Sequence, residues 1–236
     1  ACRSAGHTIV QVYSRTMENA VLLAAQTGAE ATNELSQISP AAHLYIFSVK
    51  DDALPAVIQQ MPGTGGAWVH TAGSLPMQLF AARKEEHGVI YPLQTFSKNR
   101  EINFSSVPIF IEGSSPATTR MLEELSKSLS CNVHLLSGDK RRCLHLAAVY
   151  ACNFVNHMYT LASEIIEKEE LPFGFLLPLI TETAAKVREI SPQAAQTGPA
   201  VRYDEEVMEK QLSLLTDPVM KELYSLISKD IHRHSL

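Results

Sequence analysis

The chain has 236 residues, of which 45% are hydrophobic and 19% are charged, a composition typical of a globular protein with one large or two modest domains. Its net charge of −5 argues against a general nucleic-acid binder, which would expose a basic surface. No apolar run reaches the ~18 residues that a membrane-spanning helix needs, so we expect no membrane partner.

The cysteines and histidines exclude two further classes of protein. Cys2, Cys131, Cys143 and Cys152 show neither a CxxC pair nor a regular disulfide framework, which is typical of a reducing compartment. We therefore expect a cytoplasmic protein. The nine histidines form no HExxH or other metal-ligand spacing, so no metal site is predicted.

Short β-rich runs alternate with helical patterns through the first part of the chain. The expected strands are 7–13, 29–32, 43–49, 67–70, 88–91, 107–112 and 132–136. Helices are expected at 17–27, from the Asp51–Asp52 pair to 61, at 76–83 and at 116–129. This cadence predicts an α/β fold with a Rossmann-like, doubly wound parallel sheet.

The pattern changes after Ser137, where only helices are expected. They cover 139–169, 173–190, 204–215 and 218–231. We therefore predict a Rossmann-like domain over 1–137 and an all-helical domain over 138–236. Because the helix at 173–190 is too apolar to be exposed, a homodimer through the second domain is predicted.

The first long helix carries an unusual stripe. At helical spacing, His145, Val149, Cys152 and Asn156 share one face, with Asn153 at its edge. Buried polar groups need partners, so such a stripe indicates either a site or satisfied packing residues in a polar helix contact.

Ligands of doubly wound sheets bind at the carboxyl ends of the strands. Ser14, Arg15 and Thr16 follow the first expected strand, where an acid would suit NAD and an arginine suits the 2′-phosphate of NADP. The alternative is a helix N-cap at Thr16 beside a solvated arginine. The glycine-rich turn that should precede this strand is missing, and we expect it upstream of residue 1.

Three more strand ends carry candidate residues. Val49 and Lys50 lie at the end of one strand, and the segment from His70 to Ser74 lies at the end of the next, with Gly73 permitting close backbone approach. These residues predict cofactor contacts, with Ser74 facing substrate; the alternative is a tight turn with an incidental histidine. Gln94 lies after the following strand, in a loop that could line a pocket.

The connector 196–204 combines Gly, Pro, hydroxyl groups and an arginine between two helices. Asp204 can cap the next helix, which is the simpler interpretation. An ordinary connector needs neither Thr197 nor Arg202, so both are candidate substrate contacts.

Five segments together carry a resemblance: HTAGS, YPLQTFS, IEGSS, LHLAAVYACNFVNHM and QTGPAVRYD. In this order and spacing they resemble an uncharacterised family that pairs a Rossmann NADP-oxidoreductase-type domain with a C-terminal domain of unknown function (family 2520). The layout is more remotely similar to pyrroline-5-carboxylate reductase, ketopantoate reductase and 6-phosphogluconate-dehydrogenase-like enzymes. These relatives often use a Lys and an Asn on the first long helix. Here His145 with Asn153 or Asn156 stands in a similar place.

We therefore expect an NADP(H)-dependent oxidoreductase that acts on a small carbonyl or imine at the interdomain cleft. His145 is the expected general acid, because imidazole titrates near neutral pH, and Asn153 and Asn156 would orient the substrate. The expected substrate contacts are Ser74, Gln94, Thr197 and Arg202. A non-catalytic dinucleotide sensor is the alternative, and a pure interaction protein is a third possibility.

Overall fold

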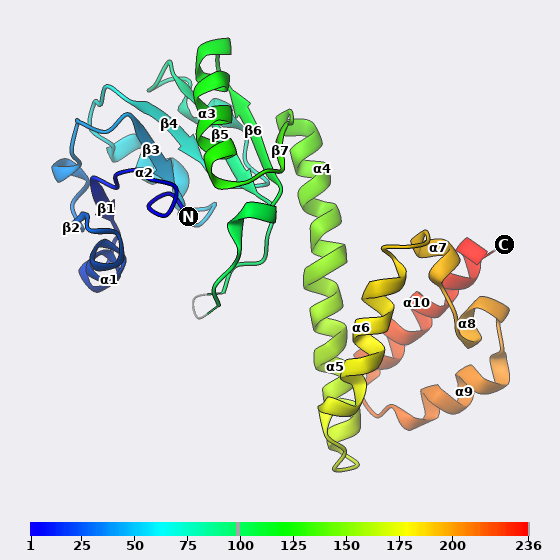
Figure 1. Ribbon diagram of the computed structural model, residues 1–236. Coiled ribbons are helices and arrows are strands. Elements are labelled where there is room, and N and C mark those ends of the chain that lie inside the picture. The colour runs from blue at the N-terminus through cyan, green and yellow to red at the C-terminus, as the bar shows by residue number, and fades with distance from the viewer. Residues whose placement is uncertain (98–99, 236) are drawn as a thin grey trace. The chain divides into compact units, whose positions relative to one another are not determined.

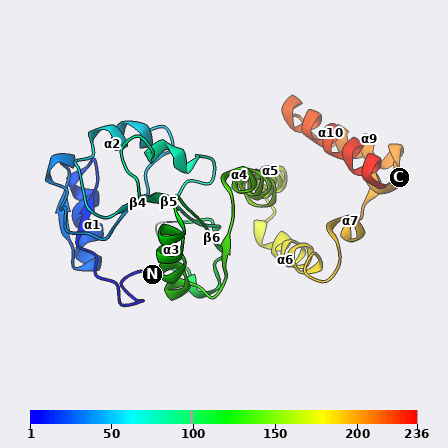
Figure 2. The same ribbon diagram turned by 90° about the horizontal axis from the view of Figure 1, so that it is seen from above.

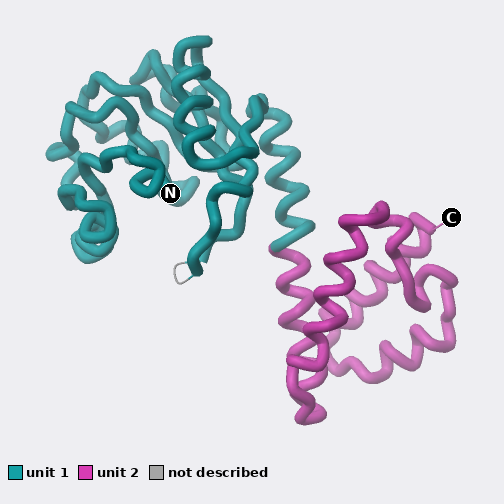
Figure 3. The backbone as a smooth tube through the Cα atoms, viewed as in Figure 1, with its two compact units in different colours: residues 1–152 teal, residues 153–236 magenta. Residues whose placement is uncertain are grey.

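The computed structural model describes residues 1–97 and 100–235. The chain divides into two compact units, residues 1–152 (unit 1) and 153–236 (unit 2), which Figure 3 colours separately. Unit 1 contains the sheets, and the described part of unit 2 contains helices only. The units divide inside a helical segment that begins just after Ser137, so the domain boundary at Ser137 stays a prediction.

Unit 1 contains two sheets (Figure 1). The smaller pairs β1 (Gln11–Tyr13) in parallel with β2 (Glu30–Thr32). The larger has the order β3 (Leu44–Phe47), β4 (Ala67–His70), β5 (His87–Pro92), β6 (Ile109–Gly113) and β7 (Val133–Leu135). This confirms the expected α/β class.

One strand pair departs from the parallel sheet that the sequence predicts. β5 and β6 run antiparallel, whereas every other neighbouring pair is parallel. A parallel connection needs a crossover, usually a helix. The described residues between β5 and β6 form only a 3-10 turn, η3 (Phe104–Ser106), and no crossover helix. The chain therefore turns back and β6 runs antiparallel to β5.

Two helices of unit 1 show a clear local signal at one end. α1 (Met17–Thr27) ends at Gly28, whose φ of 72° is the left-handed conformation that glycine adopts readily. α3 (Pro116–Leu129) begins at Ser115, whose hydroxyl accepts a hydrogen bond from the Thr118 amide. Two shorter elements are α2 (Leu54–Gln60) and a 3-10 turn, η1 (Leu35–Gln37). The helix expected at 76–83 is instead a four-residue 3-10 turn, η2 (Met77–Phe80).

The core of unit 1 lies on both faces of the larger sheet. Phe47 and Trp68 pack on one face with Leu54 and Ile58 of α2. On the other face Val69, the neighbour of Trp68, packs in the cluster that contains Leu122 of α3. Figure 2 shows α2 and α3 on opposite sides of β4 and β5. Because side chains alternate along a strand, the apolar run Ala67–Val69 supplies both faces.

The single helix expected over 139–169 is three consecutive segments. α4 (Gly138–Ala148) is followed by a π-helical segment (Val149–Phe154) and α5 (Val155–Glu167). Since a π-helix bonds residue i to i+5, it does not keep the α-helical period on which the stripe His145–Asn156 was predicted. The shared face of His145 and Asn156 is therefore not supported by the helix geometry.

Unit 2 continues with helices of 4 to 18 residues joined by turns. They are η5 (Phe173–Leu176), α6 (Leu177–Lys186), α7 (Pro192–Ala195), α8 (Pro199–Arg202), α9 (Glu205–Leu214) and α10 (Pro218–Ser235). Asp204 caps α9 as predicted, because its carboxylate accepts a hydrogen bond from the Val207 amide. None of the described helices is both long and apolar enough to cross a membrane.

Candidate active site

The carboxyl ends of β3, β4 and β5 meet at one edge of the larger sheet, because these three strands are parallel. Ser48–Asp51, Thr71–Ser74 and the end of β5 therefore lie along this edge. α4 brings His145 to the same place, since its ring contacts Tyr91 near the end of β5. The structure thus joins two predicted positions, the turn after β4 and His145.

Tyr91 and His145 form the centre of this group. The Tyr91 hydroxyl lies 2.9 Å from His145 Nδ1, and the two rings meet edge to face with centroids 5.9 Å apart. Tyr91 is buried and His145 is partly buried. Tyr91 stands at the start of the YPLQTFS segment, whose loop was expected to line a pocket, but the sequence pattern assigns no role to Tyr91 itself.

Gly73 allows this ring pair to form. A Cβ at position 73 would lie 2.6 Å from His145 Nδ1 and 2.9 Å from Tyr91 Cζ, which real Cβ atoms do not tolerate. The close approach predicted at Gly73 is therefore made by two side chains of the protein itself. Its predicted contact with a cofactor stays a prediction.

Burial raises the pKa of the Tyr91 phenol, and the nearby positive charge of Arg141 opposes that rise. Tyr91 therefore keeps its proton at neutral pH and can donate it to His145 Nδ1. In the neutral imidazole the other nitrogen, Nε2, then carries the ring proton. The pair is arranged so that a proton leaving Nε2 can be replaced at Nδ1.

His70 is fully buried and packs against Phe80, with ring centroids 5.7 Å apart. Its Nδ1 accepts a hydrogen bond from the Ala72 amide at 3.2 Å. Burial, aided by the charge of Arg141, lowers the pKa of His70 from 6.5 to about 4. The ring is neutral at pH 7 and does not reach the surface of the site, so a cofactor contact by His70 stays a prediction.

Arg141 lies one helical turn before His145 and is only 1% exposed. Its Nη1 donates to Glu112 Oε2 at 2.6 Å, and its Nη2 donates to the Leu75 carbonyl at 2.7 Å. The second oxygen of Glu112 accepts the Gly138 amide at 3.0 Å. A charged side chain in the first turn of an expected helix is usually solvated, so the sequence pattern does not single out Arg141.

The remaining predicted residues of this edge are more exposed. The Ser74 hydroxyl donates to the Asp51 carboxylate, which ties the turn after β4 to the segment after β3. Val49 and Lys50 are exposed beside it, and the Lys50 carbonyl accepts the Ala53 amide. Gln94 is exposed in the loop after β5, where its side-chain oxygen accepts the Thr95 amide.

Ser14, Arg15 and Thr16 connect β1 to α1. Thr16 occupies the N-cap position but its side chain makes no capping bond; it accepts instead from the Asn19 amide group at 2.8 Å. Arg15 is exposed, and Ser14 is partly buried. A cation and two hydroxyl groups at the start of a helix suit a phosphate, although Glu18 in the first turn opposes it.

The other four predicted residues belong to unit 2. Asn153 is exposed in the π-helical segment, and Asn156 is exposed in the first turn of α5. Thr197 and Arg202 are also exposed, in the turn before α8 and in its last turn. Their roles stay predictions.

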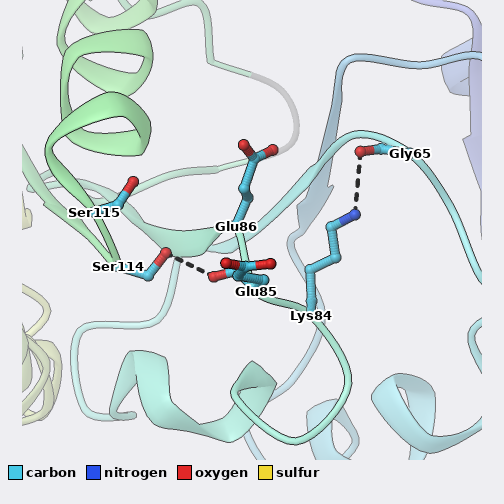
Figure 4. Close-up of a pocket in the computed structure, with 6 residues that line it drawn as sticks. All are labelled: Gly65, Lys84, Glu85, Glu86, Ser114 and Ser115. Atoms are coloured by element: carbon cyan, nitrogen blue, oxygen red, sulfur yellow. Dashed lines mark hydrogen bonds between the residues drawn. The ribbon is translucent and has the colours of Figure 1, made fainter.

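A polar pocket of about 410 Å³ lies at the opposite edge of the sheet, at the amino end of β5 (Figure 4). It is lined by Gly65, Lys84, Glu85, Glu86, Ser114 and Ser115. Lys84 Nζ already donates to the Thr64 and Gly65 carbonyls, at 2.7 and 3.1 Å, and the acidic residues Glu85 and Glu86 also line the pocket. This pocket contains none of the predicted site residues.

Solved structures resemble the chain along almost its whole length. A crystal structure of a proposed NADP oxidoreductase from Bacteroides fragilis is 47% identical, with a TM-score of 0.91, and the match covers 98% of this chain and 90% of that one. A reductive aminase from Aspergillus terreus, solved with NADPH and ethyl levulinate, is 17% identical with a TM-score of 0.73 and coverages of 98% and 87%. A pyrroline-5-carboxylate reductase from Streptococcus pyogenes is 14% identical, with a TM-score of 0.58 and coverages of 99% and 93%.

The two remote structures show a shared fold. No curated protein sequence matches the chain. Residues 107–231, more than half of the chain, match the domain of unknown function DUF2520. Together with the close Bacteroides relative, this match establishes that the chain belongs to the DUF2520 family, as its sequence motifs predict.

Proposed function

We propose that the protein is an NADP(H)-dependent oxidoreductase that reduces a small carbonyl or imine, or oxidises the corresponding alcohol or amine. The hydrogen-bonded Tyr91–His145 pair at the carboxyl edge of the sheet is the observation that carries this proposal. The names of the Bacteroides oxidoreductase and the Aspergillus aminase support the cofactor and the substrate class.

Ser14, Arg15 and Thr16 would hold the 2′-phosphate of the cofactor. Their cation and hydroxyl groups fit a dianion, and the N–H groups at the start of α1 add to this positive end. Val49, Lys50 and the segment from His70 to Gly73 would hold the rest of the cofactor at the carboxyl edge of the larger sheet. The bound nicotinamide supplies or accepts the hydride.

The protein supplies a proton during reduction. His145 Nε2 donates its proton to the oxygen or nitrogen of the substrate, while Tyr91 passes its own proton to Nδ1. The positive charge of Arg141, which opposes the rise in the pKa of Tyr91, would favour this transfer, and a proton from bulk solvent would restore the phenol afterwards. The substrate would be held by Ser74 and Gln94, with Asn153, Asn156, Thr197 and Arg202 as further contacts.

We further propose that the protein is a cytoplasmic homodimer. In unit 2 the exposed apolar side chains include Phe175, Leu179 and Leu214, and a largely apolar groove of about 510 Å³ lies among α5, α9 and α10. A second copy would cover this surface. A monomeric mass by light scattering would reject the dimer. The four free cysteines suit a reducing cytoplasm.

A ligand titration tests the cofactor. NADPH should raise the melting temperature more than NADH at the same concentration, because it binds the folded state through its extra phosphate. Arg15→Ala should remove this preference and leave the NADH response unchanged. Equal responses of the unaltered protein to both nucleotides would contradict the phosphate site, and no response to either would remove the oxidoreductase proposal.

A turnover assay with small keto acids and imines tests the proton donor. His145→Ala should lower kcat by about 10²-fold or more, because positioned general acids contribute this much, with little change in the Kd for NADPH. His43→Ala, which alters an exposed histidine before β3, is the matched control. Binding of NADPH without turnover of any substrate would favour the sensor alternative.

A further inference from the structure

The two sides of the Tyr91–His145 contact are tied together by one buried side chain. Arg141 and His145 are four residues apart on α4 and therefore share a face of the helix. Leu75, whose carbonyl accepts the Arg141 Nη2 bond, lies two residues after Gly73. Arg141 thus bonds both to the turn that Gly73 belongs to and, through Glu112, to the sheet.

Glu112 completes this arrangement. It lies on β6, opposite Val89 of β5, the strand that carries Tyr91. One carboxylate oxygen accepts from Arg141 and the other accepts from the Gly138 amide at the start of α4. Two separate points of α4 are therefore fixed to β6, which determines how far the helix is rotated toward β5.

We propose that Arg141 is a positioning residue, which through Glu112 and the Leu75 carbonyl sets the distance between His145 Nδ1 and the Tyr91 hydroxyl. The forked guanidinium is required, because it must meet a carboxylate and a carbonyl at once while it remains buried. A lysine would keep the charge but could not make both bonds in these directions.

Arg141 could act on Tyr91 through its charge as well as through its hydrogen bonds, and two substitutions separate these effects. His145 and Arg141 face Tyr91 from α4, Phe110 packs against it from β6, and Gly73 covers it from the turn after β4. The charge of Arg141 opposes the rise in the pKa of Tyr91. Arg141→Met removes both the charge and the bonds, whereas Arg141→Lys removes the bonds and keeps a charge.

The experiment follows Tyr91 and His145 by NMR in protein labelled at the tyrosine Cζ and at the histidine ring nitrogens, with Tyr91→Phe and His145→Ala to assign the signals. In Arg141→Lys we expect the nitrogen shifts of His145 to lose the preference for a proton on Nε2. Arg141→Met should lose that preference as well and also raise the pKa of Tyr91. Arg142→Met is the matched control, because Arg142 is the exposed neighbour that pairs with Asp139.

Unchanged His145 signals in a folded Arg141→Lys protein would overturn the proposal. If both Arg141 variants fail to fold, Glu112→Gln answers the same question, since it keeps an acceptor for Gly138 but weakens the Arg141 bond. Unchanged His145 signals in that variant would also overturn it.

A measurement of turnover tests the same proposal but rests on the proposed function, whereas the NMR measurement does not. With an active protein, Arg141→Lys should lower kcat by about 10²-fold at an unchanged Kd for NADPH, as expected when reacting groups are misplaced by about 1 Å. If Arg141→Lys removes the preference of His145 for a proton on Nε2 but does not change kcat, the positioning role of Arg141 is supported. The role of His145 as proton donor is then rejected. An unchanged preference would reject the positioning alone.

Discussion

The two units of the molecule bury their apolar residues very differently. In unit 1 both faces of the larger sheet are covered, and large side chains such as Trp68, Phe80 and Leu122 are almost completely buried. In the described part of unit 2 the buried apolar side chains are only Ala200, Met208 and Met220. Phe175 and Leu214 are 70% and 79% exposed there. Unit 1 therefore has its own core, whereas the stability of unit 2 depends on what covers its helices.

The largest expected effect compares Trp68 with Phe175. Trp68→Ala should lower the free energy of unfolding by about 3–5 kcal/mol, because it empties a packed site between Phe47 and Phe80. Phe175→Ala should change it by less than about 0.5 kcal/mol at protein concentrations where the chain is monomeric. Urea denaturation at several concentrations measures both. A large loss for Phe175→Ala in the monomer would show that unit 2 has a core of its own.

The next effect concerns pH and belongs to unit 1 alone. Because the pKa of His70 is about 4 in the folded state and 6.5 when exposed, the unfolded chain binds more protons between these values. The free energy of unfolding is therefore highest, as far as His70 is concerned, above pH 6.5. It should fall by up to about 3 kcal/mol as the pH is lowered toward 4. His70→Asn keeps an acceptor for the Ala72 amide, cannot titrate, and should flatten this dependence.

The control for that measurement is His43→Asn, which changes an exposed histidine and should leave the pH dependence of unfolding intact. A curve for His70→Asn with the same slope as the unaltered protein between pH 6.5 and 4 would show that another group is responsible.

The smallest expected effect compares equivalent helix caps in the two units. Ser115→Ala and Asp204→Ala each remove a side-chain acceptor from a first-turn amide, so each should cost about 1 kcal/mol in its own helix. Hydrogen exchange should show the loss spread through unit 1 for Ser115 and confined to α9 for Asp204, since a helix without a core opens locally. If the loss of exchange protection spreads equally far in both variants, the two units do not differ in how they unfold.

The sequence predicts the bounds of helices and strands in unit 1 well where glycines or turn residues flank an apolar run. α1 and β4 have the expected ends, because Gly28 stops the helix and the glycines before Ala67 and the turn after His70 delimit the strand. The antiparallel pairing of β6 with β5 is a departure from the parallel sheet that the sequence does not reveal, since an apolar strand reads the same in either direction. The π-helical segment was also missed, because its residues are all acceptable in an α-helix.

The candidate site was predicted in part, for a related reason. His145 and Gly73 were selected by their place after the strands and on the long helix, and both lie at the expected edge. Tyr91 was assigned no role and Arg141 was not selected, because a tyrosine in a strand and an arginine in a helix have ordinary uses. Their role depends on partners 54 and 66 residues away, Tyr91 with His145 and Arg141 with Leu75, and sequence spacing does not show such contacts.

Gly73 also predicts how the protein would respond to a library of all substitutions. Gly28 needs its left-handed backbone but has open space around it, so asparagine or aspartate should be accepted there better than other residues. Gly73 has no such backbone constraint, yet both rings occupy the volume of any side chain. Its tolerance should therefore depend on size alone, and second-site changes that restore a variant should map to Tyr91 and His145.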